Sequence, residues 1–237
     1  MCVAAIAWQA HPRWPLVVIG NRDEYHHRPA APLGRWDSGI VAGRDLLAGG
    51  TWLGIGEGRL GLVTNFRVEG YPLPGRPSRG GLITGWLEDG SLPDIAAMNP
   101  FNLLLADARQ ARIVSNWPQV GETPLEPGIH GLSNGAFAAP WPKSRALVDA
   151  LARWVAQPGD DAEPLFAALA DSAPRPGPGP EPRLSSVFIA DPVYGTRCST
   201  VLAIGSDGAG RIVERSYDAE GRVTGEVALP LRWPVEG

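Results

Sequence analysis

Apolar residues gather in short runs separated by turn residues, a pattern that is typical of β-strands. The first two runs, at 2–8 and 16–20, are apolar at nearly every position, and Pro12 and Pro15 lie in the segment between them. Strands that are apolar on both faces belong inside a layered fold. Further strands are predicted at 40–42, 52–56, 60–66, 102–106, 111–116, 186–191, 199–204, 211–216 and 223–229.

Helical periodicity dominates the stretches between these groups of strands. In 142–156, apolar residues recur three and four positions apart, and Pro158 follows the segment. Because strands come first, helices next and strands again, the order indicates an α+β fold with layers. Further helices are predicted at 79–90, at 91–98 with Ser91 as N-cap and Asp94 in the capping-box position, and from Asp160 or Asp161 onward.

The size and composition of the chain fit a single domain over residues 1–237. Of its 237 residues, 44% are hydrophobic and a further 30 are glycine, which is enough apolar material for a substantial core. The tract PRPGPGPEPR at 174–183 is the one low-complexity segment. We expect it to form an exposed loop within that domain.

Charge and cysteine content exclude several classes of protein. The net charge of −4 is mild and no basic stripe occurs, so a nucleic-acid partner is not expected. No apolar stretch reaches the roughly 18 residues of a membrane span, which predicts no integral membrane segment. The first residues lack the basic region of a secretory signal, and two cysteines cannot form a disulfide framework. These features together predict a cytoplasmic protein.

The histidines do not form a metal site. His26 and His27 are adjacent, and His11 and His130 stand alone, without the Cys/His spacing of a zinc site. We therefore expect ordinary surface or loop histidines, no metal and no required cofactor.

Cys2 is the first candidate for chemistry. Methionine aminopeptidase generally removes Met1 before a small second residue, which would leave a cysteine carrying both a thiol and a free α-amine. That amine, with an unperturbed pKa of about 8, can take the thiol proton, so nucleophile and base reside in one residue. The alternative is an ordinary buried cysteine, which is common because cysteine packs well.

A charged run faces Cys2 if the first two strands form an antiparallel hairpin. Paired residue numbers would then sum to about 25, which places Cys2 opposite residues near 22–24. There Arg22, Asp23 and Glu24 interrupt apolar sequence. A guanidinium beside a thiol favours the thiolate, and a carboxylate could orient the amine. The alternative is a strand end at which the charges simply face water.

Two asparagines and an arginine lie in segments with the character of site loops. Asn65 ends a predicted strand, and Asn134 stands among glycines in HGLSNG. Asparagine amides and strand-end N–H groups commonly form an oxyanion hole, although an asparagine taken alone is more often a turn residue. Arg197 precedes an apolar strand and is similarly open to a structural or a site role.

Several short strings, in this order and spacing, resemble those of one family. They are MC at the start, NRDEY followed by HRP, GGTWLGI, LVTNF, FNLLLAD, HGLSN, PW at 140–141, YGTR and ERS. The chain is identified on them as a member of the NRDE family, also called the transport and Golgi organization protein 2 family. The strings extend from residue 1 to about 217, so the resemblance covers nearly the whole chain.

The resemblance implies a four-layer αββα sandwich of the N-terminal-nucleophile (Ntn) hydrolase type. The family is similar in fold to penicillin V acylase and bile salt hydrolase, which use an N-terminal cysteine, an arginine and aspartate on the next strand, two asparagines and a distal arginine. The matching catalytic positions in this chain are Cys2, Arg22, Asp23, Asn65, Asn134 and Arg197.

One departure from the acylase pattern bears on the chemistry. In the acylases two residues usually separate the arginine and the aspartate, whereas Arg22 and Asp23 are adjacent here. Adjacent strand residues point to opposite faces, so both cannot flank the thiol without a bulge. Either one of the two acts alone, or Asn21 and Glu24 take the places of the acylase pair.

The resemblance supports two functions of comparable weight. As a hydrolase, Cys2 would cleave an amide or thioester of an acylated small molecule, with Asn134 and an N–H near Asn65 holding the oxyanion. Trp8, together with the predicted ligand-binding residues Trp52 and Trp141, would suit an apolar acyl group.

As a non-catalytic carrier, the same pocket, with Asn21 and Glu24 among its ligand-binding residues, would hold haem or acyl-CoA and related lipids. Proteins of this family have been linked to haem trafficking and to lipid homeostasis. Haem would then be bound cargo, held by labile and largely apolar contacts, because the sequence has no c-type haem motif. A purely structural role is a third possibility, since fold does not fix function.

Overall fold

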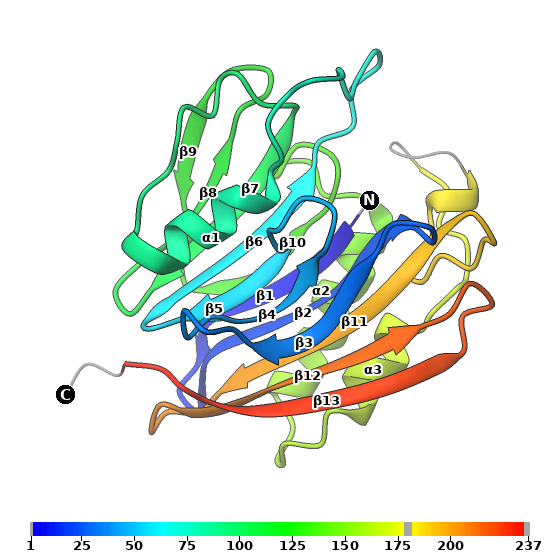
Figure 1. Cartoon of the computed structure of the whole chain (residues 1–237). Coiled ribbons are helices and arrows are strands. Elements are labelled where there is room, and N and C mark those ends of the chain that lie inside the picture. Colours follow the sequence, from blue (N-terminus) through cyan, green and yellow to red (C-terminus); the bar gives the residue numbers. More distant parts are fainter. Residues whose placement is uncertain (1, 178–181, 235–237) are drawn as a thin grey trace. The chain divides into compact units, whose positions relative to one another are not determined.

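The computed structural model describes residues 2–177 and 182–234, and within them the chain is an α+β fold with two antiparallel sheets and few helices (Figure 1). The predicted α+β class is therefore confirmed. The described residues divide into two compact units, one made of 2–27 with 127–177 and 182–234, and the other of 28–126.

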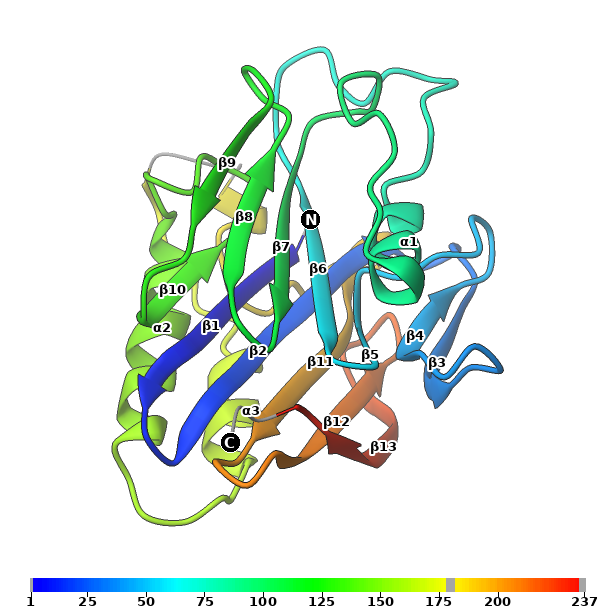
Figure 2. The same cartoon turned by 90° about the vertical axis from the view of Figure 1, so that its left-hand side faces the viewer.

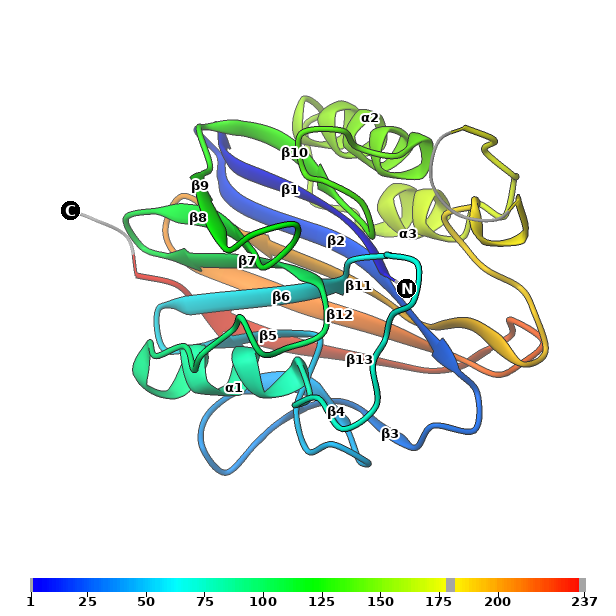
Figure 3. The ribbon, with the colours of Figure 1, turned by 90° about the horizontal axis from the view of Figure 1, so that it is seen from above.

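Within the described residues, the first unit contains a six-stranded sheet in the order β10-β1-β2-β11-β12-β13, with every neighbouring pair antiparallel. Helices α2 and α3 cover one face of this sheet (Figure 3). The elements of this unit are β1 (Cys2–His11), β2 (Trp14–Tyr25), β10 (Gly128–Leu132), α2 (Pro142–Val155), α3 (Glu163–Leu169), β11 (Tyr194–Ile204), β12 (Ala209–Tyr217) and β13 (Val223–Arg232).

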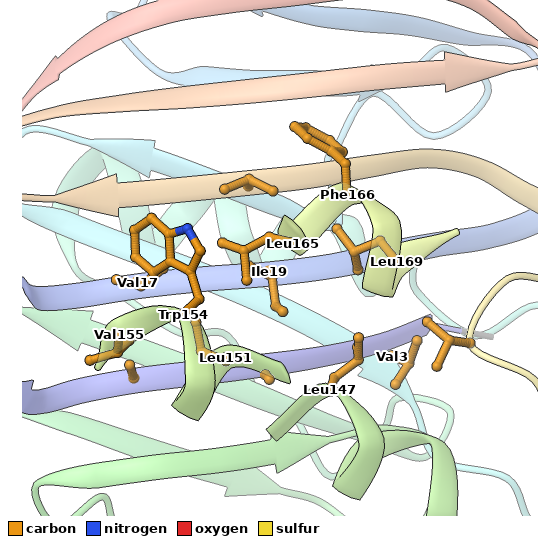
Figure 4. Close-up of a cluster of buried hydrophobic side chains, with 14 of the residues drawn as sticks. Val3, Val17, Ile19, Leu147, Leu151, Trp154, Val155, Leu165, Phe166 and Leu169 are labelled. Atoms are coloured by element: carbon orange, nitrogen blue, oxygen red, sulfur yellow. The ribbon is translucent and has the colours of Figure 1, made fainter. Parts of the chain in front are cut away.

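The core of the first unit forms where the apolar side of the helices meets one face of the sheet. Alternate residues of β1 and β2 point toward the helices, because successive strand residues face opposite ways. The helical residues lie three and four positions apart, as the sequence predicted for 142–156, so that helix is confirmed. Figure 4 shows part of this cluster, which includes Val3, Ala5, Ala7, Val17, Ile19, Leu147, Leu151, Trp154, Val155, Leu165, Phe166 and Leu169.

The second unit is built on a meander. Its described residues form a seven-stranded sheet in which strands adjacent in sequence are also adjacent in space, from β3 to β9. Figure 2 shows β6, β7, β8 and β9 side by side. The elements are β3 (Ala30–Arg35), β4 (Val41–Asp45), β5 (Leu53–Gly56), β6 (Arg59–Asn65), α1 (Gly80–Asp89), β7 (Phe101–Asp107), β8 (Ala111–Ser115) and β9 (Gly121–Pro124).

Glycines let α1 pack closely on the sheet of the second unit. A Cβ on Gly50 would lie 2.4 Å from the carbonyl carbon of Gly80, at the start of the helix. A Cβ on Gly54 would lie 2.9 Å from Leu87 Cδ1, and one on Gly61 would lie 3.1 Å from Ile83 Cδ1. Gly50 and Gly54 of GGTWLGIG, together with Gly61 of β6, therefore allow the close approach of α1.

Two predicted elements, a strand at 186–191 and a helix at 91–98, are absent from the structure. Residues 186–191 form no strand, although most of them are buried. Their backbone bonds instead to scattered partners, among them Phe188 N–H to Asp171 C=O and Ile189 N–H to Thr196 Oγ1, both 2.9 Å. An apolar run indicates burial, and it makes a strand only where a neighbouring strand is free to pair.

Residues 91–98 form no helix. Asp94 accepts a hydrogen bond from Ala96 N–H at 3.0 Å and thus closes a local turn in place of a capping box. Asn116 Nδ2 donates to Ile95 C=O and Met98 C=O, so a distant side chain holds this segment in its turn conformation.

The strands that the sequence did not predict, β3, β9 and β10, all lie at sheet edges. Edge strands bury less of their surface, so they lack the apolar runs that signal central strands. In the predicted loop 174–183, Pro182–Leu184 form a short 3-10 helix (η1), and 178–181 lie outside the described residues. The assignment of one domain over 1–237 stays a prediction.

Candidate functional site

Cys2 lies directly opposite Arg22 in the β1–β2 hairpin. This confirms the hairpin and the register expected from the sequence, which placed Cys2 across from 22–24. Residues paired in a ladder point to the same face. Because Val3 and Ile19 point toward the helices, Cys2 and Arg22 lie on the opposite face of the sheet.

Asn21 lies on the helix-covered face, where its side-chain amide is fully used. Its Nδ2 donates to Leu169 C=O at 2.8 Å and to Val187 C=O at 3.0 Å. Its Oδ1 accepts a hydrogen bond from Ser199 Oγ at 2.6 Å, and Tyr217 OH donates to that same Ser199 oxygen at 3.1 Å. In this structure Asn21 thus joins β2 and β11 to the end of α3.

Asp23 lies two residues further along β2, on the same side as Asn21. It is buried, and its Oδ1 accepts a hydrogen bond from Thr196 Oγ1 at 2.8 Å. Tyr194 OH donates to the Asp23 backbone carbonyl, also at 2.8 Å. Burial raises the pKa of Asp23, and the nearby positive charge of Lys143 acts in the opposite direction.

The Cys2 thiol is buried, with 7% of the residue exposed. Burial raises its pKa, and the negative charge of Asp23 adds to that effect. A backbone hydrogen bond from Asp23 and the positive charge of Arg22 both lower the pKa. With Met1 in place the thiol is therefore mainly neutral near pH 7, and a nearby proton acceptor is needed to make it nucleophilic.

The HGLSN segment brings Asn134 to the amino end of β1. Strand β10 pairs with β1, and Ala4 lies opposite Leu132. Just beyond, Ser133 Oγ donates to Cys2 C=O at 3.1 Å and lies 3.3 Å from Asn134 Oδ1. Asn134 itself is fully buried.

Arg197 sits in a bulge of β11, between Thr196 and Cys198. Its Nη1 donates to the carbonyls of Tyr25 and His26 at 2.9 and 3.2 Å. Partial burial lowers its pKa, and so does the positive charge of Arg22, whereas Glu24 acts in the opposite direction. The bulge thus places the Arg197 guanidinium within electrostatic reach of Arg22.

The remaining predicted residues lie in different places. Glu24 Oε1 accepts a hydrogen bond from the Tyr25 N–H at 2.9 Å, and Trp141 is the N-cap residue of α2. Trp52 and Asn65 belong to the second unit. Trp52 is buried before β5, and half-buried Asn65 ends β6 opposite Phe101.

Polar residues that the sequence did not single out lie on the same face as Cys2. Cys198 also pairs with Arg22, so the two thiols flank one guanidinium. Their Cα atoms are two strand spacings, or about 10 Å, apart, which is too far for a disulfide. Burial raises the pKa of Cys198 well above its usual value, and buried Glu214 adds to the shift. The sequence analysis missed Cys198 because it did not predict that β11 pairs with β2.

Lys143 is the other residue that sequence reasoning missed. It lies in the first turn of α2 with 1% of its surface exposed, and its Nζ donates to Leu184 C=O at 3.3 Å. Helical periodicity alone gives no sign that a lysine at this position turns inward.

The part of the chain that the structure describes contains no group of three or more histidine, cysteine or carboxylate side chains suited to hold a metal ion. Among the same residues, no helix has the length and apolar character needed to cross a membrane.

Comparison with known proteins gives consistent matches over both compact units. The family model described as Transport and Golgi organisation 2 matches residues 1–219. The chain is similar to the Transport and Golgi organization protein 2 homolog of Bos taurus, with 32% identity over 91% of this chain and 93% of the relative. The homolog of Homo sapiens is 31% identical and that of Mus musculus 28%, with the same coverage.

Proposed function

The chain belongs to the Transport and Golgi organisation 2 family, and starting from that membership we propose that it is an Ntn-hydrolase-like protein that cleaves an amide or thioester bond of an acylated small molecule. In the proposed reaction Cys2 becomes the amino-terminal residue once Met1 is removed. Its α-amine takes the thiol proton, and the sulfur attacks the carbonyl carbon. The observation that carries this proposal is the in-register pairing of Cys2 with Arg22.

Residues of the first unit supply the other parts of the mechanism. The Arg22 guanidinium lies on the same face as the sulfur and lowers the thiol pKa, which favours the attacking form. Asn134, which follows the Ser133 that donates to Cys2 C=O, is the proposed oxyanion donor. The leaving amine or thiol takes the proton held by the α-amine, and water then cleaves the thioester formed on Cys2.

We also propose the αββα sandwich of Ntn hydrolases as the fold. In support, the first unit has an antiparallel sheet with α2 and α3 packed on it, and the described part of the second unit has an antiparallel sheet with the single helix α1 packed on it. Such a sheet with its helices is one half of that sandwich. The proposed roles of Asn65 and Trp52 rest on the family resemblance.

The test begins with intact mass spectrometry of the purified protein, which shows whether Met1 is removed. The protein is then treated with p-nitrophenyl acetate. We expect one acetyl adduct per chain, which is lost completely in Cys2→Ala and retained in Cys198→Ala. Cys198→Ala is the matched control because Cys198 is the only other cysteine in the sequence. Retention of Met1, or an adduct that survives in Cys2→Ala, would contradict the mechanism.

A carrier of haem, acyl-CoA or related lipids is the second candidate. The observation in its favour is that burial raises the pKa of the Cys2 thiol, because a neutral buried thiol suits packing against cargo better than attack. Quenching of tryptophan fluorescence by haem and by palmitoyl-CoA separates the two ligands. A carrier predicts the same affinity in wild type and Cys2→Ala, together with no acetyl adduct.

A further inference from the structure

A short turn joins β4 to β5 (Figure 2), and it is both exposed and apolar. Leu46 is 57% exposed and Leu47 69%, the highest value for a large hydrophobic side chain among the described residues. Ala48 is exposed as well, and so are Pro29 and Ala30 at the start of β3. Pro29 lies beside the turn, because its C=O accepts a hydrogen bond from Leu46 N–H at 3.0 Å. These five residues therefore form one apolar patch, the leucine tip.

The backbone N–H groups of this turn are bonded within the protein. Asp45 Oδ1 accepts hydrogen bonds from Leu47 N–H at 3.1 Å and from Ala48 N–H at 3.0 Å. The Asp45 C=O accepts another from Gly49 N–H at 2.8 Å. Together with Leu46 N–H, all four N–H groups of the turn thus have partners. A backbone that enters an apolar medium needs such bonds, because an unsatisfied polar group is costly there.

The same hydrogen bonds fix the shape of the turn. Asp45 N–H also donates to Gly50 C=O at 2.9 Å, so the turn is closed at both ends. Gly50 in turn lies against the start of α1, where an added Cβ would meet the backbone of Gly80. The leucines are therefore held outward on a preformed turn, and no backbone ordering opposes their transfer out of water.

The charges beside the leucine tip favour a negatively charged surface. The carboxylate of Asp45 is paired with Arg28, whose Nε lies 2.6 Å from Asp45 Oδ2. Arg44 is exposed, and its Nε donates to Gly49 C=O at 3.3 Å, at the edge of the turn. The Arg44 guanidinium also lies over the ring of Trp36, 4.6 Å from its centroid. Arginine and tryptophan beside an apolar insertion are typical of the interface between membrane and water.

The size of the leucine tip favours a lipid surface over a protein partner. A stable protein interface uses about 20–30 residues on each side, whereas the tip offers five. A bilayer requires no matching shape, and burial of two leucine side chains supports weak, reversible attachment. We propose that the leucine tip inserts into the interface of an anionic lipid bilayer, with Arg44 at the level of the phosphates. This surface role goes beyond the proposed function and does not depend on Cys2.

Vesicle flotation of the intact chain tests the proposal. The protein is mixed with vesicles of phosphatidylcholine and phosphatidylglycerol in equal amounts, and the bound fraction is followed over a lipid titration. We expect binding to these vesicles and weaker binding to pure phosphatidylcholine. The double substitution Leu46→Ser with Leu47→Ser should lower the partition coefficient by about ten-fold or more, because two exposed leucines no longer leave water.

Two further variants separate the leucine tip from general surface effects. Val120 is 53% exposed in the same compact unit and directly precedes β9, at the other edge of the sheet. Val120→Ser is the matched control and should leave vesicle binding unchanged. Arg44→Gln should weaken binding to the anionic vesicles by about five-fold and leave binding to pure phosphatidylcholine nearly unchanged.

Absence of wild-type binding to the anionic vesicles, or equal binding to both kinds of vesicle, would overturn the proposal. So would undiminished binding of the folded double variant. A wild-type dimer that dissociates in the double variant, as seen by analytical ultracentrifugation, would assign the leucines to a second copy of the chain and equally overturn it.

Circular dichroism shows whether the double variant folds. If it does not, Leu47→Ser takes its place, with an expected drop in the partition coefficient of about three- to ten-fold. If this single variant also fails to fold, the leucines support the fold instead of facing a membrane, and the proposal is wrong.

Discussion

Replacing Asn21 with aspartate is expected to lower the free energy of unfolding by about 3–5 kcal/mol. The two side chains have nearly the same shape, so packing is preserved. In the variant an oxygen replaces the Nδ2 that donates to Leu169 C=O and Val187 C=O. Two buried carbonyls would then face a third acceptor, and protonation of the aspartate could satisfy only one of them. Urea unfolding followed by tryptophan fluorescence measures the change.

Glu24→Gln is the matched control for this substitution. Glu24 lies in the same charged run and is only partly buried, and the glutamine oxygen can still accept the hydrogen bond from Tyr25 N–H. We expect its unfolding free energy to stay within about 0.5–1 kcal/mol of the wild type. Equal, small effects of the two substitutions would show that the Asn21 network does not stabilise the fold.

Gly50→Ala is expected to destabilise the second compact unit by about 3 kcal/mol or more. The new Cβ would lie 2.4, 2.6 and 2.8 Å from the carbonyl carbon, carbonyl oxygen and Cα of Gly80. All three are backbone atoms, so no side-chain rotation relieves the clash. The amino end of α1 would have to move away from the segment between β4 and β5, and a thermal unfolding scan would record the loss.

Gly81→Ala tests whether that loss reflects the close approach. Gly81 is the next residue of α1, it is exposed, and an added Cβ meets nothing within 4 Å. Alanine is preferred over glycine in helices by about 1 kcal/mol, so this variant should be as stable as the wild type or slightly more so. If Gly50→Ala is tolerated equally well, the packing of α1 on this sheet is looser than described.

The local part of the candidate site could be predicted from the sequence. Two apolar runs separated by a short segment with prolines specify a hairpin, and the ladder rule then places Cys2 against Arg22. The strand period of two also specifies that Asn21 and Asp23 face the opposite side from Arg22. The hydrogen bonds of Asn21 to Leu169 at the end of α3 and to Val187 could not be predicted. They join residues that are 148 and 166 positions apart in the sequence.

Elements defined by an apolar signal alone were the least predictable. Residues 186–191 are mostly buried without forming a strand, and β9 is a strand with every residue exposed. Burial and strand pairing are separate properties. The first depends on what covers a segment, and the second on whether a neighbouring strand presents free N–H and C=O groups.

The sequence by itself determined the α+β class, the family, and the hairpin that sets a thiol against a guanidinium, because each depends on order and spacing along a short stretch of chain. Only the tertiary structure decided that Ser133, the neighbour of Asn134, donates to the Cys2 carbonyl, and that Lys143 turns inward and donates to Leu184 C=O. Those contacts arise where glycines allow α2 to approach β10. Such an approach depends on the shapes of distant surfaces, which no local periodicity encodes.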